Sequence, residues 1–120
     1  MMQKVVAVDL DGCILRYVPG WFSIRRYGSL IPGAKSVLKE LRQKGWWVVI
    51  YTVRGDRQEI KSALEVVGVY QEVHYDAINR RKGVLKGSYN GKMGASAYID
   101  DRAIAFRGRW TGVLEELEKL

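Results

Sequence analysis

Two aspartates that follow a short apolar run are the residues of this sequence best placed to do chemistry. The run extends from Val5 to Val8, and Asp9 and Asp11 come directly after it, separated by Leu10. An uninterrupted apolar run of this length is typical of a buried strand, so we expect both carboxylates at its carboxyl end. Carboxylates so placed can act as a nucleophile, as a general acid or base, or as ligands of a hard cation.

Polar side chains also follow two later apolar runs. Thr52 follows the run Trp46 to Tyr51, and Asp100 and Asp101 follow the run Ala95 to Ile99. Carboxylates that converge at one edge of a sheet repel one another unless a cation lies among them. Oxygen ligands without a nearby His or Cys favour Mg²⁺. The sequence therefore predicts a magnesium site built from Asp9, Asp11, Asp100 and Asp101.

Removal of a phosphoryl group from an alkoxide is a reaction that fits this set. It requires a nucleophile, neutralisation of the non-bridging oxygens and a proton for the leaving oxygen. Asp9 can supply the nucleophile, Mg²⁺ with a lysine the neutralisation, and Asp11 the proton. We expect the backbone carbonyl of Asp11 to face the metal while its side chain reaches the leaving group.

Three amphipathic helices are predicted from one spacing of apolar residues, i, i+3, i+4 and i+7. The matching sets are Ala34/Val37/Leu38/Leu41, Ile60/Ala63/Leu64/Val67 and Trp110/Val113/Leu114/Leu117. Local chemistry agrees with the ends of the first two. Pro32 opens the first and Gly45 follows it, while Asp56 and Glu59 form a capping-box pattern for the second, which Gly68 follows.

The helices alternate with the apolar runs, to which a weaker strand candidate, Glu72 to Tyr75, is added. This alternation predicts an α/β fold, a three-layer α/β/α Rossmann-like sandwich with a central parallel sheet and no cap domain. Residues 1–120 are expected to form one domain. Ligands of such sheets bind beyond the carboxyl ends of the strands. Gly12 to Leu30 and Ile78 to Gly94 are predicted to be long loops at the same edge.

Composition limits the class of protein. No apolar run approaches the roughly 18 residues of a membrane span, and the first residues do not form a signal peptide, so a soluble, cytoplasmic protein without membrane association is expected. Cys13 is the single cysteine, which excludes an intrachain disulfide and a four-cysteine zinc site. It also cannot serve a Cys-x5-Arg phosphatase loop, because Pro19 stands where the arginine is needed.

The net charge of +7 is unevenly distributed. Two stretches, Gly12 to Lys39 and Ala77 to Ile99, contain basic residues and no acid, and aromatic residues are interleaved in the first. Such stretches favour nucleic acid or another polyanion as partner. The alternative, that the charge serves solubility alone, is equally weighted.

The order of these polar residues resembles the haloacid dehalogenase superfamily, in particular its phosphatase branch, over nearly the whole chain. Four segments match the family's motifs in order: Asp9-Leu10-Asp11-Gly12, Thr52, Lys92 and Tyr98-Ile99-Asp100-Asp101. One departure is Cys13, which stands where these motifs usually carry Thr. A receiver-type phosphoacceptor domain fits less well, since its acceptor aspartate would stand after the central strand, where Thr52 lies here.

The resemblance implies a role for each of these residues. Asp9 would form a phosphoaspartate, and Asp11 would act as general acid and then as general base. Thr52 and Lys92 would bind the phosphate, with Lys86 as the alternative lysine. Asp101, in preference to Asp100, would bind Mg²⁺ together with Asp9 and the Asp11 carbonyl.

The short gaps between the motifs resemble those of capless members of the family, whose open sites suit macromolecular substrates. Thr52-Val53-Arg54 and Ile99-Asp100-Asp101-Arg102, with Trp110 beyond, are similar to the phosphatase domain of phage-type polynucleotide kinase/phosphatases. That likeness implies that Arg54 contacts the substrate phosphate or orients the site. The expected substrate is a nucleic-acid or nucleotide phosphate end. The alternatives are a small-metabolite phosphatase and a non-catalytic or weakly catalytic nucleic-acid-binding module.

Overall fold

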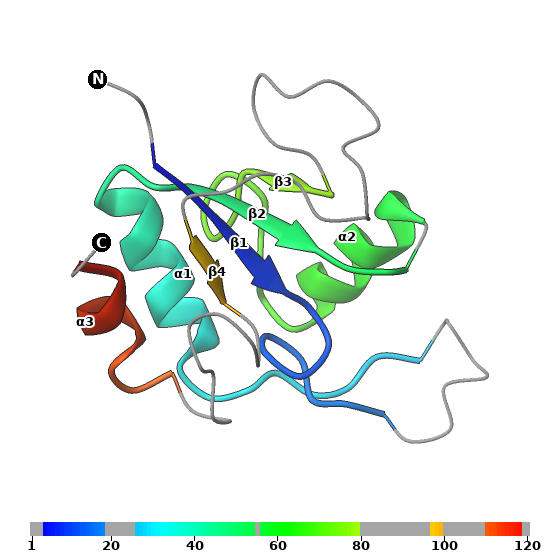
Figure 1. Ribbon diagram of the computed structural model, residues 1–120. Coiled ribbons are helices and arrows are strands. Elements are labelled where there is room, and N and C mark those ends of the chain that lie inside the picture. Colours follow the sequence, from blue (N-terminus) through cyan, green and yellow to red (C-terminus); the bar gives the residue numbers. More distant parts are fainter. Residues whose placement is uncertain (1–3, 19–25, 55, 80–96, 100–109, 119–120) are drawn as a thin grey trace.

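A four-stranded parallel sheet forms the centre of the protein (Figure 1). The structure, a computed structural model, describes residues 4–18, 26–54, 56–79, 97–99 and 110–118. The elements in chain order are β1 (Val5–Asp9), α1 (Ala34–Gln43), β2 (Trp47–Tyr51), α2 (Arg57–Val66), β3 (Ala77–Ile78), β4 (Ala97–Ile99) and α3 (Val113–Glu118). The strands lie in the order β3-β2-β1-β4, and every pair is parallel. The α/β, Rossmann-like class expected from the sequence is confirmed.

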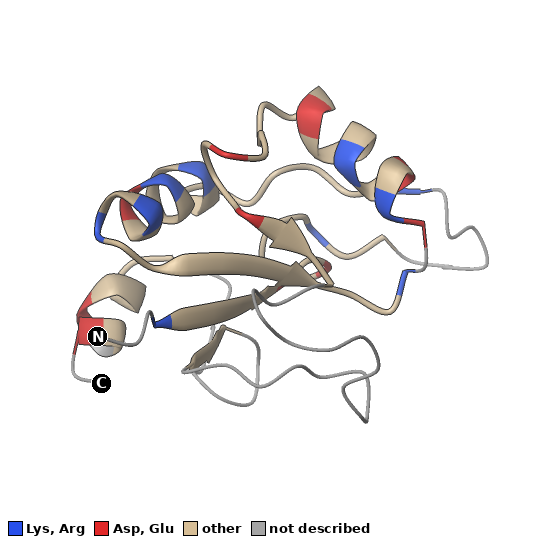
Figure 2. Cartoon of the chain, turned by 90° about the horizontal axis from the view of Figure 1, so that it is seen from above, with Lys and Arg blue, Asp and Glu red and all other residues tan. Residues whose placement is uncertain are grey.

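The two faces of the sheet differ in what packs on them. Because side chains alternate along a strand, Val6 and Val8 of β1 face one side and Val5 and Ala7 the other. The first side belongs to the main core, which also contains the buried side chains of α1, α2 and α3. Figure 2 shows α1 and α2 on the same side of the sheet. The second side forms a smaller cluster of Val5, Ala7 and Val49. Helices on that side, which a three-layer sandwich requires, do not occur among the described residues.

The ends of the helices follow the predicted chemistry. Asp56 is the N-cap of α2, and its Oδ1 accepts hydrogen bonds from the backbone N–H groups of Gln58 and Glu59 at 3.0 and 3.1 Å. α1 begins at Ala34, after Pro32 and Gly33, and Gly45 follows its C-cap with a φ of 91°. A left-handed residue at this place terminates a helix and is favourable for glycine.

The weaker strand candidate, Glu72 to Tyr75, is wrong. These residues form a turn in which the backbone N–H groups of Val73 and His74 donate to the carbonyl of Tyr70, and Glu72 has a φ of 72°. The strand that pairs with β2 is the two-residue β3 immediately afterwards, with Ile50 opposite Ile78. Tyr75 is apolar because it is buried in the main core, whereas Val73 is exposed, so the apolar residues of this turn misled the prediction.

The predicted loop from Gly12 to Leu30 folds back on itself. The arms on either side of residues 19–25 run alongside each other, with a bridge between Leu15 and Leu30 (Figure 1). The backbone N–H of Arg16 donates to Ser29 at 2.8 Å. A Cβ on Gly28 would lie 1.9 Å from the Arg16 carbonyl oxygen, so only glycine permits this approach. The second predicted loop, Ile78 to Gly94, begins too early, because Ile78 is the last residue of β3; beyond Asn79 it lies outside the described residues.

No helix in the described part of the chain is long and apolar enough to cross a membrane.

Candidate functional site at the carboxyl edge of the sheet

Parallel pairing brings the ends of the three longer strands to one edge. Asp9, the last residue of β1, lies opposite Tyr51, the last residue of β2, and a further bond joins the Leu10 N–H to the Tyr51 carbonyl at 3.2 Å. On the other side of β1, Val8 lies opposite Ile99, the last residue of β4. Asp9 and Thr52 therefore leave neighbouring strands at the same edge, as the sequence predicted.

A tight turn after β1 positions Asp11. The backbone N–H groups of Ile14 and Leu15 both donate to the Leu10 carbonyl at 3.0 Å, and the N–H of Gly12 donates to Leu15 at 2.7 Å. Gly12 has a φ of 92°, a left-handed conformation that costs other residues energy, and a Cβ there would lie 3.4 Å from the Tyr17 ring. The turn places the Asp11 carboxylate beyond the strand end.

Asp11 and Arg54 form a bidentate ion pair. Arg54 Nε donates to Asp11 Oδ2 at 2.9 Å, and Arg54 Nη2 donates to Asp11 Oδ1 at 3.0 Å. The two side chains are only 19% and 12% exposed, which limits solvent screening of the pair. Two parallel N–H···O bonds fix the orientation of both groups. The geometry therefore joins the first and second predicted motifs directly.

Two groups from the folded-back loop hold the Arg54 guanidinium. Its Nη2 also donates to the Arg26 carbonyl at 2.7 Å, and its central carbon lies 4.1 Å from the centroid of the Tyr27 ring. The hydrogen bond with Asp11 raises the pKa of Arg54, so this side chain remains a cation at all relevant pH values. Burial raises the pKa of Tyr27, against the opposing effect of the Arg54 charge.

Asn79 is a residue of the site that the sequence analysis missed. It directly follows β3 and has a left-handed φ of 53°. Its Oδ1 accepts from the Thr52 backbone N–H at 2.8 Å, and its Nδ2 donates to the Arg54 carbonyl at 3.5 Å. The Thr52 hydroxyl oxygen in turn accepts from the Arg54 N–H at 3.2 Å. Asn79, directly after β3, thus holds the backbone of the Thr52–Arg54 segment through its side chain. Asparagine adopts a left-handed backbone more readily than most residues, so its presence at position 79 was the available signal.

Cys13 connects the turn after β1 to the later part of the chain. Its thiol contacts the Ile99 carbonyl at 3.6 Å, and its own carbonyl accepts a hydrogen bond from Trp110 Nε1 at 2.9 Å. Both Cys13 and Trp110 are buried. Cys13 is therefore a packed anchor of the turn that carries Asp11.

The structure brings four of the predicted site residues, Asp9, Asp11, Thr52 and Arg54, to one edge of the sheet. The other predicted residues lie outside the described ranges: Lys92, its alternative Lys86, Asp100 and Asp101. The last two directly follow Ile99 in the sequence.

The predicted magnesium site lies only partly within the described residues. Asp9 and Asp11 are the proposed ligands within the described residues, and no group of three or more His, Cys, Asp or Glu side chains forms there. Both carboxylate oxygens of Asp11 bond to Arg54. The arrangement fits a role of Asp11 in metal binding through its backbone carbonyl better than through its side chain. The carboxylate of Asp9 fits the hard-cation chemistry expected of the site.

Comparison with known proteins supports the fold. No protein-family model matches the chain, and no curated protein matches it. Among solved structures, it is similar to a conserved protein coded by a locus from Bacteroides thetaiotaomicron, with a TM-score of 0.73 and 24% sequence identity. The alignment covers 98% of this chain and 92% of that one. At this identity the likeness establishes a shared fold over almost the whole chain.

Proposed function

We propose that this protein is a Mg²⁺-dependent phosphatase of the haloacid dehalogenase type that hydrolyses a phosphomonoester through a phosphoaspartate on Asp9. The observation that carries the proposal is the pairing of β1 with β2, which sets Asp9 beside Thr52 while the turn after β1 directs Asp11 toward Arg54. A nucleophile, an acid/base group and two phosphate-binding groups then meet at the edge where parallel sheets bind ligands.

In the proposed first step, an Asp9 carboxylate oxygen attacks phosphorus and the bond from phosphorus to the ester oxygen breaks. The leaving oxygen takes a proton from Asp11. In the second step, Asp11 takes a proton from water as the water oxygen attacks phosphorus, the bond from Asp9 to phosphorus breaks, and inorganic phosphate is released. Bound Mg²⁺ would neutralise charge on the phosphoryl oxygens, together with Lys92. Asp100 and Asp101, which follow Ile99, are the further proposed metal ligands.

Thr52 is suited to bind the phosphate through its side chain. Its hydroxyl oxygen accepts the Arg54 N–H, which uses a lone pair and leaves the hydroxyl proton for donation to a phosphoryl oxygen. The Asn79 contacts fix the backbone on which this hydroxyl stands. Such preorganisation is what electrostatic stabilisation of a transition state requires.

Arg54 has two competing partners in this scheme. An arginine guanidinium binds carboxylates and phosphates with the same bidentate geometry. Arriving substrate phosphate would draw Arg54 away from Asp11, and the freed carboxylate would take up a proton from solvent and then donate it to the leaving oxygen. The proposed role of Arg54 is therefore to exchange the Asp11 carboxylate for the substrate phosphate.

Steady release of phosphate from p-nitrophenyl phosphate tests the proposal. The wild-type protein should release phosphate in the presence of Mg²⁺ and should stop when EDTA removes the metal. Asp9→Asn should abolish release while leaving the circular dichroism spectrum unchanged. Lys39→Gln, on the exposed side of α1, is the matched control and should keep the wild-type rate. Absence of release with every divalent metal tried would overturn the proposal.

The proposed substrate is a nucleic-acid or nucleotide phosphate end, on the basis of the net charge of +7 and the basic stretches. Faster release from a 3′-phosphorylated oligonucleotide than from sugar phosphates would support it, and the reverse order would identify a small-metabolite phosphatase.

One observation favours a second candidate, a nucleic-acid-binding module without turnover. The Asp11 carboxylate is bonded by Arg54 through both oxygens, an arrangement that can also be purely structural.

A further inference from the structure

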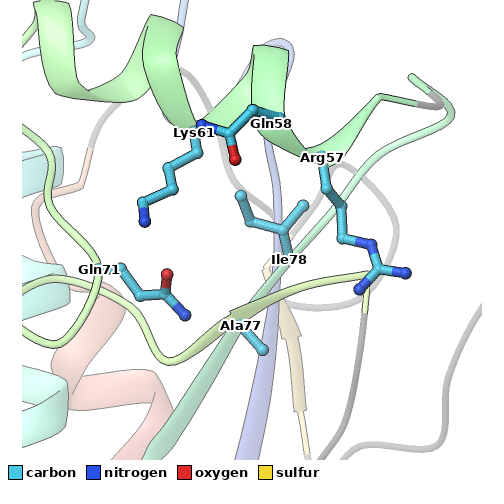
Figure 3. A pocket seen from close by; sticks show the side chains of 6 residues that line it. All are labelled: Arg57, Gln58, Lys61, Gln71, Ala77 and Ile78. Atoms are coloured by element: carbon cyan, nitrogen blue, oxygen red, sulfur yellow. The ribbon is translucent and has the colours of Figure 1, made fainter.

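A basic pocket lies between α2 and β3, outside the group of Asp9, Asp11, Thr52 and Arg54. It has a volume of about 300 Å³ and is lined by Arg57, Gln58, Lys61, Gln71, Ala77 and Ile78. Figure 3 shows the side chains of Arg57 and Lys61 extending from α2 toward β3, with Ile78 between them. None of the six lining residues is acidic. The pocket therefore combines two cations and two amides over an apolar floor.

The charges of this pocket are uncompensated within the described part of the chain. Neither Arg57 nor Lys61 forms an ion pair there, whereas Arg42, Lys44 and Arg54 all do. The helix terminus is also satisfied, because Asp56 accepts the N–H groups of Gln58 and Glu59. Any anion bound here would thus be held by side chains of a concave site, with Arg57 and Lys61 on either side of Ile78.

The position of the pocket relates it to the proposed site. Arg57 follows Arg54 by three residues, across the segment that enters α2. Asn79, which braces Thr52, directly follows Ile78 of the pocket floor. The pocket and the candidate site are thus joined through β3 and the beginning of α2.

We propose that this pocket binds a phosphate group, and that the group is a backbone phosphodiester of a nucleic-acid strand whose terminal phosphate occupies the site at Asp9. The assignment to a nucleic-acid substrate rests on the proposed function, but the binding of phosphate by the pocket does not. A strand held at two places is bound more tightly than a single phosphate. The pocket would accordingly favour an oligonucleotide over a mononucleotide.

The test measures binding of a fluorescent 3′-phosphorylated oligonucleotide by anisotropy, in an Asp9→Asn background that prevents turnover. Replacing both pocket cations (Arg57→Gln with Lys61→Gln) should raise the Kd about tenfold, since charge-assisted hydrogen bonds are lost. The slope of log affinity against log salt should fall by about 0.7, for the one lost phosphate contact with a single strand. The matched control removes two cations at the amino end of the sheet, outside both basic stretches (Lys4→Gln with Lys44→Gln), and should change the Kd less than twofold.

Equal losses of affinity in the pocket variant and the control would overturn the proposal, because net charge alone would then explain the binding.

Titration with inorganic phosphate, followed by NMR at the amides of residues 57–61, separates the two sources of phosphate. Shifts with inorganic phosphate and no change in oligonucleotide affinity would assign the pocket to free phosphate and overturn the backbone assignment. In otherwise wild-type protein, the pocket variant should lower kcat/KM for the oligonucleotide and leave p-nitrophenyl phosphate hydrolysis unchanged. If the protein released no phosphate but the pocket variant still weakened oligonucleotide binding, the phosphatase proposal would be contradicted and the proposal for the pocket would stand.

Discussion

Two aspartate–arginine pairs stand at opposite ends of the sheet and differ in how they are anchored. At the amino end, Asp76 Oδ1 accepts from Arg42 Nε at 3.0 Å, and its Oδ2 accepts from the Val48 backbone N–H at 2.7 Å. Arg42 also donates to the Glu72 carbonyl. At the carboxyl end, the oxygens of Asp11 both accept from Arg54, which also donates to the Arg26 carbonyl and stacks on the Tyr27 ring.

The difference indicates different purposes for the same chemical pair. Asp76 is 7% exposed and joins α1, β2 and the turn before β3, so its loss would leave a buried backbone N–H without a partner. Asp11 is 19% exposed, and the guanidinium that holds it could bind a phosphate instead. One pair fixes the fold, and we propose that the other is exchanged during the reaction.

The largest expected effect concerns the exchangeable pair. Asp11→Asn should lower kcat by about 10²–10⁴-fold, because general acid–base catalysis is lost. KM should not rise, since Arg54 would remain available for the phosphate. The free energy of unfolding should fall by about 1–2 kcal/mol, less than for a fully buried pair, because the Asn oxygen can still accept one Arg54 N–H. Steady-state kinetics and urea denaturation of the same sample measure both quantities. Wild-type kcat would show that Asp11 is as structural as Asp76.

Asp76→Ala should have the opposite effects, a large loss of stability and little loss of kcat. It removes the partner of Arg42 and of the Val48 N–H, and should lower the free energy of unfolding by about 3 kcal/mol. At temperatures where the variant is folded, its kcat for p-nitrophenyl phosphate should remain within about twofold of the wild-type value. Urea denaturation gives the first quantity and phosphate release the second. A loss of stability no greater than that of Asp11→Asn would break the comparison.

Asn79→Ala tests the brace behind the carboxyl-end pair. The Thr52 N–H would lose its acceptor, which costs about 1 kcal/mol of stability, and the Thr52–Arg54 segment would be less well positioned. We expect kcat to fall about tenfold with little change in KM. Asn79→Asp keeps the acceptor for Thr52 and should restore part of kcat. A purely structural role would lower stability and leave kcat unchanged in both variants.

The smallest expected effect is a loss of stability at low pH, caused by His74 near the amino end of the sheet. Burial lowers the pKa of His74 from its ordinary value of 6.5, and the charge of Lys35 adds to this. The unfolded chain therefore binds the proton more readily than the folded protein. Stability that is fully present above about pH 6.5 should be lost as the pH falls below that value toward the lowered pKa. His74→Gln should weaken this decline in thermal unfolding between pH 5 and 7, and an unchanged pH profile would contradict the assignment.

The sequence predicted the parts of the fold that rest on long, regular patterns. The apolar spacing of α1 and α2, the Asp56 cap and the strands around Val6 and Val49 were all expected from local residue types. β3 was misplaced, because two residues carry no periodicity and the apolar turn before them resembles a strand. Its pairing is decided by tertiary contact with β2, which no local pattern reveals.

The sequence predicted which strand ends carry the candidate site, but it did not predict the side-chain contacts among the site residues. Asp9, Asp11 and Thr52 could be found because parallel strands end at one edge. The bond from Arg54 to Asp11 crosses 43 positions, and Tyr27 and Asn79 enter from segments without a recognisable motif. Such side-chain contacts depend on rotamers and on the folded-back loop, so spacing along the chain could not predict them. The roles of Lys92, Asp100 and Asp101 remain predictions.

The anchoring of Cys13 has a consequence for the order of folding. The turn that carries Asp11 is held by Ile99 and by Trp110, 86 and 97 positions further along the chain. β1, the strand before it, is likewise flanked by β4. During synthesis, the first of the proposed catalytic segments would leave the ribosome long before the residues that fix it. Closure of such long-range contacts is slow, so the site would form among the last steps of folding.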